Sequence, residues 1–371
     1  MIKTFDCAVI GMGISGVLLA KMLARIGLQV AVFHDDKPIK TSFAESLPAS
    51  INPLLARLGL HPYLHHSAHF PCSGIYSSWG SAALQQPDVE RALQQKPGWK
   101  VDKSYLISQL VEDLPETVVM FGKVSGLEQQ HTHWQISSKN HMGEAVQVSA
   151  RFIADASGRQ GYLPRALNIP RHYFDKLMAF VVNVPSVKIA QFQHPVLVEA
   201  QQHCWSLVSQ VSEKSTMLAI FSNQTSPDFE RYNSFENWHE VSEKSIYFKQ
   251  FIKNNIHVPV RKVNASSHIC SQLTGRNWLM LGDAAMSFDP LSSHGMTTAM
   301  YMADKAGEAI AQYFSGKSQG LDDYSEQMTS IYNTYLNELV ERYNGEQRWS
   351  GSPFWQSKQA IHVSNEGAFV C

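Results

Sequence analysis

The stretch "CAVIGMGISGVLLAKMLARIGLQVAVFHDD", residues 7–36, decides the fold of this chain. Its first residues, "CAVI", are apolar and partly β-branched, as in a buried strand. Three glycines follow at the spacing G-x-G-x-x-G, namely Gly11, Gly13 and Gly16. Apolar residues then recur at helical spacing up to Gly27, where a helix is expected to end, and "QVAVF" at 29–33 is typical of a second buried strand. The order of strand, tight turn, helix and strand predicts a Rossmann-like unit.

Each position of the glycine loop has a physical reason. Gly11 permits the tight turn, Gly13 lets backbone N–H groups approach a pyrophosphate, and Gly16 lets helix and strand pack closely. The helix start, with Ile14 and Ser15, adds partial positive charge. We therefore predict that a dinucleotide binds here, the alternative being a glycine-rich turn without a ligand.

The end of the second strand departs from this pattern. An acidic residue normally binds the adenosine ribose there, whereas this chain has His34, followed by Asp35 and Asp36. Either Asp35 or His34 would contact the ribose, and the alternative for His34 is a solvated loop position. We therefore expect weak adenosine binding.

Composition excludes several classes of protein. The 371 residues are 44% hydrophobic and 17% charged, which suits a globular chain with two lobes or with one large domain and an insertion. The formal net charge of −1 predicts no nucleic-acid or membrane partner. The stretch "GVLLAKMLARIGL" carries Lys21 and Arg25 and is too short to span a bilayer.

The beginning of the chain and its cysteines favour a cytoplasmic protein. "MIKTFDCAVIG" lacks the features of a signal peptide. The cysteines form no C-x-x-C pair and are expected to be reduced: Cys7, Cys72, Cys204, Cys270 and Cys371. No H-E-x-x-H motif occurs among the histidines, so we predict no metal.

Two later segments identify the dinucleotide. "ARFIADASGRQGYLPRALNI", residues 150–169, predicts a strand that ends on Asp155, followed by small residues and Gly158, and is similar to the middle motif of flavin hydroxylases. "NWLMLGDAAMSFDPLSSHGM", residues 277–296, predicts a strand that ends on Asp283. It resembles the flavoprotein signature whose aspartate binds the ribityl chain, which implies FAD.

Small residues between this strand and the next helix suit a flat isoalloxazine ring. Gly295 would let the backbone approach the ring, Pro290 would direct the loop, and the helix start would face the pyrimidine edge. Met296, Ala299, Met300 and Ala303 are expected to pack this helix inward. The remaining residues that we expect to bind FAD are Ser46, Lys103, Asp155, Gly158, Gly282, Ser292, Ser293 and Met296. Ser292 and Ser293 are also typical turn formers.

With these motifs, nearly the whole chain resembles the tryptophan-halogenase-like branch of the flavin-dependent monooxygenases. "ESLP" at 45–48 is similar to that branch's G-E-S-L-P, with Ala44 in place of glycine. "PVLVEAQQHCWSLVSQV" at 195–211 resembles its substrate-domain sheet through Glu199 and Trp205. Halogenation is disfavoured because the W-x-W-x-I-P segment is missing, and "ENWHEVSEKS" at 236–245 does not match it.

The tail "YNGEQRWSGSPFWQ", residues 343–356, is similar to flavoproteins that accompany cysteine-tryptophylquinone amino-acid oxidases. This resemblance implies an enzyme that hydroxylates a tryptophan in the precursor of a partner oxidase. Its aromatic residues Trp349, Phe354 and Trp355 would either dock the partner or seal the C-terminal segment onto the body.

The resemblance implies an α/β, flavin hydroxylase-like fold in three parts. The FAD-binding domain is expected to be discontinuous, over 1–60, 101–170 and 263–320. A mostly antiparallel-sheet substrate domain would take 61–100 and 171–262, and C-terminal helices 321–371. Within the last part, residues 321–345 are expected to be helical, because apolar residues recur at spacings of three and four: Tyr324, Met328, Ile331, Tyr335 and Leu339. No second glycine-rich βαβ unit exists for NAD(P)H, so the external electron donor is transiently bound NAD(P)H or a separate reductase.

Three residues are candidates for catalysis: His294, Glu45 and Trp79. His294 would act as acid or base near neutral pH, or be a loop residue held by backbone hydrogen bonds. Glu45 would act beside the ring or anchor a loop, and Trp79 would stack on substrate or be a packed aromatic. Two other functions stay open: a hydroxylase or reductase of a small aromatic or lipid, and a non-catalytic chaperone of the oxidase.

Overall fold

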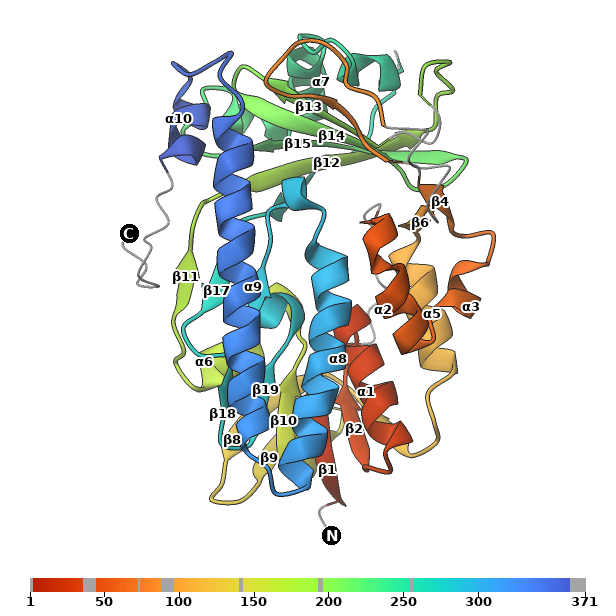
Figure 1. Ribbon diagram of the computed structural model, residues 1–371, viewed down its shortest axis with the longest axis vertical. Coiled ribbons are helices and arrows are strands. Elements are labelled where there is room, and N and C mark those ends of the chain that lie inside the picture. The colour runs from red at the N-terminus through yellow and green to blue at the C-terminus, as the bar shows by residue number, and fades with distance from the viewer. Residues whose placement is uncertain are drawn as a thin grey trace.

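The computed structural model describes residues 3–35, 45–72, 74–87, 97–139, 143–192, 196–253 and 256–360. Asp36, Ala44 and Cys371 lie outside these ranges. Figure 1 shows a sheet flanked by helices in the lower part of the molecule and a second sheet across its top. This arrangement confirms the predicted α/β fold with a second, mostly antiparallel sheet.

The lower sheet has eight strands, in the order β18-β19-β10-β1-β2-β7, with β8 and β9 joined to β10 through β9. Its strands are β1 (Lys3–Ile10), β2 (Val30–Phe33), β7 (Val118–Phe121), β8 (Val124–Gln129), β9 (Trp134–Lys139), β10 (Ala145–Asp155), β18 (Thr274–Gly275) and β19 (Trp278–Met280). Strands β19, β10, β1, β2 and β7 run parallel. Parallel strands are buried on both faces, which explains the apolar end of β1 at residues 7–10 and the apolar run of β2.

Three helices pack beside this sheet: α1 (Ile14–Arg25), α5 (Lys103–Glu112) and α8 (Gly295–Phe314). The predicted strand–turn–helix–strand unit of residues 7–33 is confirmed. One boundary was predicted wrongly, because β19 ends at Met280 and not at Asp283. Gly282 has φ +60° and turns the chain into a 3-10 turn over Gly282–Ala284.

Two small sheets connect the layers. The first has the order β3-β6-β4 and consists of β3 (Glu45–Leu47), β4 (Phe70–Cys72) and β6 (Gly98–Val101), beside α2 (Asn52–Leu58) and α3 (His61–Leu64). The second has the order β11-β17-β20 and consists of β11 (Arg171–Tyr173), β17 (His268–Cys270) and β20 (Met286–Ser287).

The upper sheet has six strands in the order β16-β12-β15-β14-β13-β5. These are β5 (Tyr76–Ser78), β12 (Met178–Pro185), β13 (Val196–Gln201), β14 (Cys204–Gln210), β15 (Ser215–Ser222) and β16 (Arg261–Asn264). All neighbours are antiparallel except β13 and β5. Side chains alternate between the faces, so Cys204 and Val208 belong to the core beside α7 (Phe235–Ser242), whereas Trp205 and Leu207 face the lower layer.

Two C-terminal helices complete the fold, α9 (Gln319–Asn344) and α10 (Pro353–Gln359). Helix α9 confirms the helix predicted from residue 321 to 345 and runs along both layers (Figure 1). Phe354 and Trp355 of α10 are fully buried, and the Trp355 indole N–H donates to the Gln201 carbonyl at 2.9 Å. These contacts favour the sealing role for the C-terminal aromatics over partner docking.

The division of the chain into three parts stays a proposal. The pairing of strands indicates which layer the ends of the proposed substrate segments belong to. Strands β4 and β6 pair within the sheet of β3, and β11 pairs with β17, so these segments associate with the lower layer.

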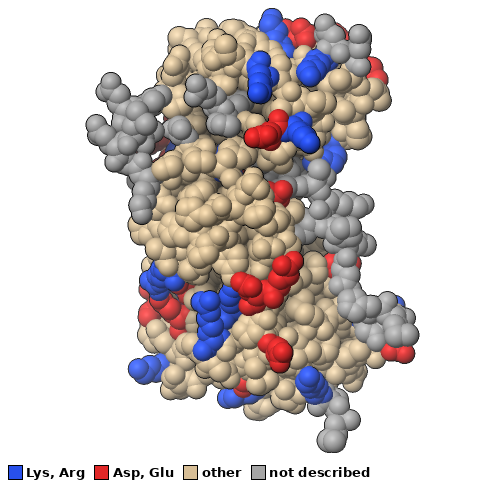
Figure 2. Space-filling model, turned by 90° about the vertical axis from the view of Figure 1, so that its right-hand side faces the viewer, with Lys and Arg blue, Asp and Glu red and all other residues tan. Residues whose placement is uncertain are grey.

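On the face that Figure 2 shows, acidic and basic residues are interspersed. Within the described residues, no helix combines the length and the apolar character that a membrane crossing requires.

Candidate active site

The glycine loop is packed so tightly that two of its positions exclude a side chain. Gly11 has φ +100°, and a Cβ there would lie 2.5 Å from the carbonyl oxygen of Ala156. A Cβ on Gly16 would lie 2.1 Å from the Gly11 carbonyl oxygen. The turn between β1 and α1 therefore rests directly on the turn after β10.

Gly13, in contrast, faces open space, since nothing lies within 4 Å of a Cβ placed there. It is the N-cap of α1, yet no side chain caps this helix and no acidic residue lies in its first turn. The first N–H groups of a helix need an acceptor, and here the chain leaves them to a ligand. The glycine loop and the start of α1 thus form a cradle, and a pyrophosphate fits this cradle in charge and geometry.

Helix α8 begins in the same way. Its N-cap His294 makes no capping hydrogen bond with its side chain, the first turn has no acidic residue, and a Cβ placed on Gly295 would have nothing within 4 Å. Figure 1 shows that α1 and α8 both begin at the end of the lower layer that faces the six-stranded sheet. Two uncapped helix starts at one edge suit an anionic cofactor with charge at two places, as FAD has.

The turn at Gly282 completes the cradle. A Cβ on Gly282 would lie 2.8 Å from Ser15 Oγ, so this turn touches the first turn of α1. The Asp283 side chain is 43% exposed and pairs with Arg159 Nε at 3.5 Å. Asp283 is thus presented beside the glycine loop, as expected for a ligand of the ribityl chain.

Asp155 has a supporting position. Its side chain is fully buried, Oδ1 accepts the Ser157 N–H at 2.9 Å, and Oδ2 accepts the Leu163 N–H at 2.7 Å. Burial raises the pKa of this carboxyl group, and the hydrogen bonds around it lower the pKa. Asp155 therefore holds the turn that carries Gly158 (φ +68°) instead of presenting its own oxygens to a ligand.

The loop before α8 is built by its own side chains. Asp289 caps the turn over Pro290–Ser292 by accepting the Leu291 N–H at 2.9 Å. Ser292 Oγ donates to the Asp289 carbonyl at 2.8 Å, and Ser293 has φ +55°, which non-glycine residues rarely adopt. These contacts favour turn formation for both serines, with Met296 buried just behind them.

Glu45 and Lys103 lie together beside the cradle. Their ion pair measures 3.2 Å, and both side chains are partly exposed. The Glu45 carboxylate raises the pKa of the Lys103 amine, burial opposes this, and Asp283 raises the pKa further. Lys103 is therefore a cation held by Glu45, suited to a phosphate or to the flavin's polar edge, while Glu45 is anchored by it.

The other two candidates for catalysis point toward the C-terminal helices. Burial and Arg342 of α9 lower the pKa of the His294 imidazole, and Glu338 opposes this. His294 is therefore neutral near pH 7 and suited to accept a proton. The Trp79 indole N–H donates to the Arg342 carbonyl at 2.8 Å, and the Trp79 ring centroid lies 5.3 Å from that of Trp355. Trp79 is thus a packed aromatic against the C-terminal helices.

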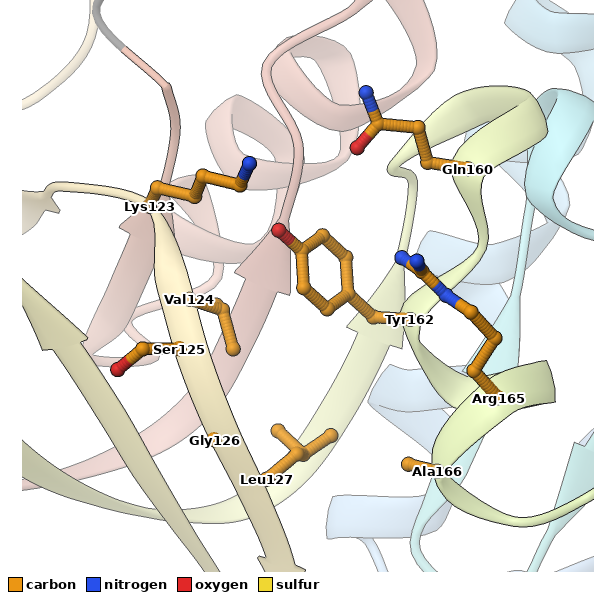
Figure 3. A pocket seen from close by; sticks show the side chains of 9 residues that line it. All are labelled: Lys123, Val124, Ser125, Gly126, Leu127, Gln160, Tyr162, Arg165 and Ala166. Atoms are coloured by element: carbon orange, nitrogen blue, oxygen red, sulfur yellow. The ribbon is translucent and has the colours of Figure 1, made fainter.

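The structure adds a pocket that the sequence did not reveal. It has a volume of about 410 Å³, and Figure 3 shows Tyr162 at its centre with the hydroxyl group directed toward the Lys123 amine. The Arg165 guanidinium lies 5.2 Å from the centre of the Tyr162 ring. Burial raises the pKa of Tyr162, Arg165 lowers it, and Asp35 and Asp155 raise it.

Lys123 of the pocket lining follows β7, whose last residue Phe121 pairs with Phe33 at the end of β2. The pocket therefore lies near the end of β2, where the adenosine of a dinucleotide is expected. The His34 N–H donates to the Phe121 carbonyl at 3.0 Å and ties this end of β2 to β7. Sequence reasoning missed Tyr162, Lys123 and Arg165 because they carry no motif. The segment "GRQGYLPR" contains two of them, but its glycine turn is the only part with a recognisable pattern.

The chain is similar over nearly its whole length to known flavoproteins. The family described as FAD binding domain matches residues 4–338. LodB of Marinomonas mediterranea, named as an FAD-dependent oxidoreductase, is 25% identical over 369 residues, which cover 97% of this chain and 98% of LodB.

Solved structures of flavoproteins share the fold. The myxobacterial chondrochloren halogenase CndH superposes with a TM-score of 0.84 at 20% identity, covering 98% of this chain and 87% of CndH. QhpG, a peptidyl tryptophan dihydroxylase described as essential for tryptophylquinone cofactor biogenesis, has a TM-score of 0.72 at 18% identity, covering 98% of this chain and 82% of QhpG. The predicted fold, the predicted FAD and the resemblance to the tryptophan-halogenase-like branch are thereby confirmed. The chain belongs to the FAD binding domain family and is an FAD-dependent oxidoreductase of the flavin monooxygenase type.

Proposed function

We propose that this flavoprotein hydroxylates a tryptophan in the precursor of a partner oxidase, on the way to a cysteine tryptophylquinone. The observation that carries the proposal is that both uncapped helix starts lie at the end of the lower layer that faces the upper sheet, whose inner face is apolar and buried. The side chains of this apolar surface come from β12, β14 and β15 and include Val181, Leu207, Met217, Ala219 and Phe221.

This surface suits an indole. Trp205 stacks on Phe221 with ring centroids 3.8 Å apart and planes at 9°. Binding sites for aromatic ligands are mostly apolar, with a few polar groups that fix orientation. Because an indole ring is electron-rich, it needs positioning and exclusion of water more than a strong base.

The residues that would hold FAD are those of the cradle: the glycine loop, Lys103, Asp283 and the start of α8, with the Tyr162 pocket for adenosine. When bound and reduced, FAD would supply the activation of oxygen. Electrons would come from NAD(P)H or a separate reductase, because the cradle is occupied by FAD itself and the sequence has no second glycine-rich βαβ unit.

The likeness to QhpG supports a protein substrate, and that to LodB, which matches 97% of this chain and 98% of LodB, supports the class of FAD-dependent oxidoreductase. QhpG, which shares the fold, is described as a peptidyl tryptophan dihydroxylase. The tail at 343–356, which resembles companions of quinone-bearing oxidases, points in the same direction.

The test is a single-turnover experiment with labelled oxygen. The FAD-loaded, reduced protein is mixed with ¹⁸O₂ and the precursor of a cysteine-tryptophylquinone oxidase, and the mass of the tryptophan peptide is measured. We expect labelled oxygen in that peptide. Uptake into free tryptophan or indole at the same rate would instead indicate a small-molecule hydroxylase. Complex formation without any gain of oxygen would indicate a chaperone.

The Tyr162 pocket gives a separate prediction. Replacing Tyr162 with alanine is expected to weaken FAD binding about tenfold, because an aromatic stacked on a base contributes about 1–3 kcal/mol. The measurement is a titration of the apoprotein with FAD, in which binding is monitored by flavin fluorescence. Tyr173→Ala removes an exposed tyrosine from β11 and serves as the matched control. An unchanged affinity in Tyr162→Ala would show that adenosine lies elsewhere.

A further inference from the structure

Lys100 is a buried lysine at the junction of the two layers. It lies on β6 opposite Ser46 of β3 and Phe70 of β4, and only 1% of its surface is exposed. Its amine donates to Ser46 Oγ at 3.0 Å and to Ser209 Oγ of β14. Since Ser209 continues the inward face that carries Trp205 and Leu207, the amine lies at the edge of the apolar surface described above.

The amine has no carboxylate in ion-pair range within the described residues. An ammonium group carries three donors, whereas the contacts found in this part of the chain give Lys100 two hydroxyl acceptors. Burial lowers the pKa of Lys100 from 10.5 to about 8, and the nearby groups Cys72 and Glu45 oppose this. A buried amine without an ion-pair partner is costly to keep, so its retention calls for a use.

We propose that Lys100 is the acid–base residue of the oxygenation site, an inference that rests on the proposed function. Insertion of one oxygen atom into a ring C–H bond consumes O₂, two electrons from the external donor and two protons, and yields C–OH and water. Lys100 Nζ gives one proton to the oxygen atom that leaves as water. The neutral amine then takes up the proton that the ring carbon loses, which restores the ammonium. The second proton of the water and the proton of the new hydroxyl group come from solvent, so two protons are consumed overall.

Lys100→Met tests this because methionine has similar length and no proton to give. We expect oxygen insertion to fall about 100-fold, within the range of general acid–base catalysis, while FAD binding and reduction change less than about twofold. Lys100→Arg is expected to be as slow, because a guanidinium stays protonated. Lys21→Met is the matched control, since Lys21 is also buried with a pKa lowered by burial but contacts Tyr63 and Asp113 on another side of the molecule.

The pH profile distinguishes proton transfer from packing. In the wild type, insertion is expected to decline as the pH rises through about 8, where Lys100 loses its proton. This decline should be absent in Lys100→Met. If Lys100→Met inserts oxygen within about threefold of the wild type, the proposed role is overturned while the proposed function stands.

A measurement without turnover keeps the proposal testable if a variant fails to fold. Protein labelled with ¹³Cε-lysine and loaded with oxidised FAD is titrated by NMR, and Lys100 is assigned by its absence in the variant or from relayed contacts to Ser46 and Ser209. We expect a midpoint near 8. A midpoint near the usual lysine value of about 10.4 would overturn the inference. Failure of the wild type to oxygenate the precursor would instead overturn the proposed function together with this role.

Discussion

Replacing Gly13 with aspartate is expected to weaken FAD binding about 100-fold relative to Gly13→Asn, while the apoprotein becomes no less stable. Nothing lies within 4 Å of a Cβ at Gly13, so both side chains fit. Both also cap α1, which has no side-chain cap, and such caps typically contribute about 1 kcal/mol. The two variants therefore differ in charge alone.

The negative charge of the aspartate should cause the difference in FAD affinity between the two variants. Two like charges about 5 Å apart repel by about 3 kcal/mol at an effective dielectric constant of about 20, which corresponds to about 100-fold in affinity. The measurements are FAD titration and urea unfolding of the apoprotein. If Gly13→Asp bound FAD as well as Gly13→Asn, the pyrophosphate would not lie at the start of α1.

The second large effect is expected at Lys358, in α10. This fully buried amine pairs with Asp175 and lies 3.0 Å from Asp289 Oδ2. The Tyr343 hydroxyl donates to the same Asp289 oxygen at 2.8 Å. Burial lowers the pKa of Lys358, and the two carboxylates raise it by more, so the amine stays charged. This group ties the C-terminal segment to the loop that leads into α8.

Lys358→Met is expected to lower the free energy of unfolding by about 3–5 kcal/mol, because it leaves buried carboxylates without their cation. The measurement is urea unfolding of the apoprotein. Lys305→Met is the control, since Lys305 pairs with Glu308 at a partly exposed site of α8 and should contribute less than about 1 kcal/mol.

The loss should depend on pH in a defined direction. Burial raises the pKa of Asp289, and Lys358 opposes this, so removing Lys358 raises the pKa of Asp289 further. A carboxyl group whose pKa is higher in the folded state loses stabilising effect as pH rises through that pKa. The defect of Lys358→Met should therefore be smaller at pH 5 than at pH 8. An equal or larger loss of unfolding free energy at pH 5 would show that the unpaired carboxylates do not cause the destabilisation.

Local features of the sequence predicted much of the lower layer. The spacing of Gly11, Gly13 and Gly16 between two apolar runs defined the first βαβ unit, since turn geometry and burial of a parallel strand depend on neighbouring residues. The periodic apolar residues of α8 and α9 defined those helices for the same reason. Where a single residue decided a boundary, as Gly282 did for β19, the local pattern was insufficient.

The candidate site was predictable in part. The cradle residues Gly13, Asp283 and Gly295 could be found because they belong to motifs. Trp79 was expected to stack on substrate or to be a packed aromatic, and Asp155 was expected to bind FAD. The structure shows the hydrogen-bond partner of each on another element, Arg342 for Trp79 and Leu163 for Asp155. Tyr162 and Lys100 carried no motif and were missed.

The sequence alone therefore determined that a glycine-rich dinucleotide unit begins the chain and that a flavin-type turn and helix lie near residue 290, because both depend on contacts within one short segment. Only the tertiary structure decided which side chains are buried together. Lys100 lies 109 residues from Ser209 and Lys358 lies 183 from Asp175. Such pairs are set by strand register and helix packing, and no spacing along the chain encodes which buried charge meets which partner.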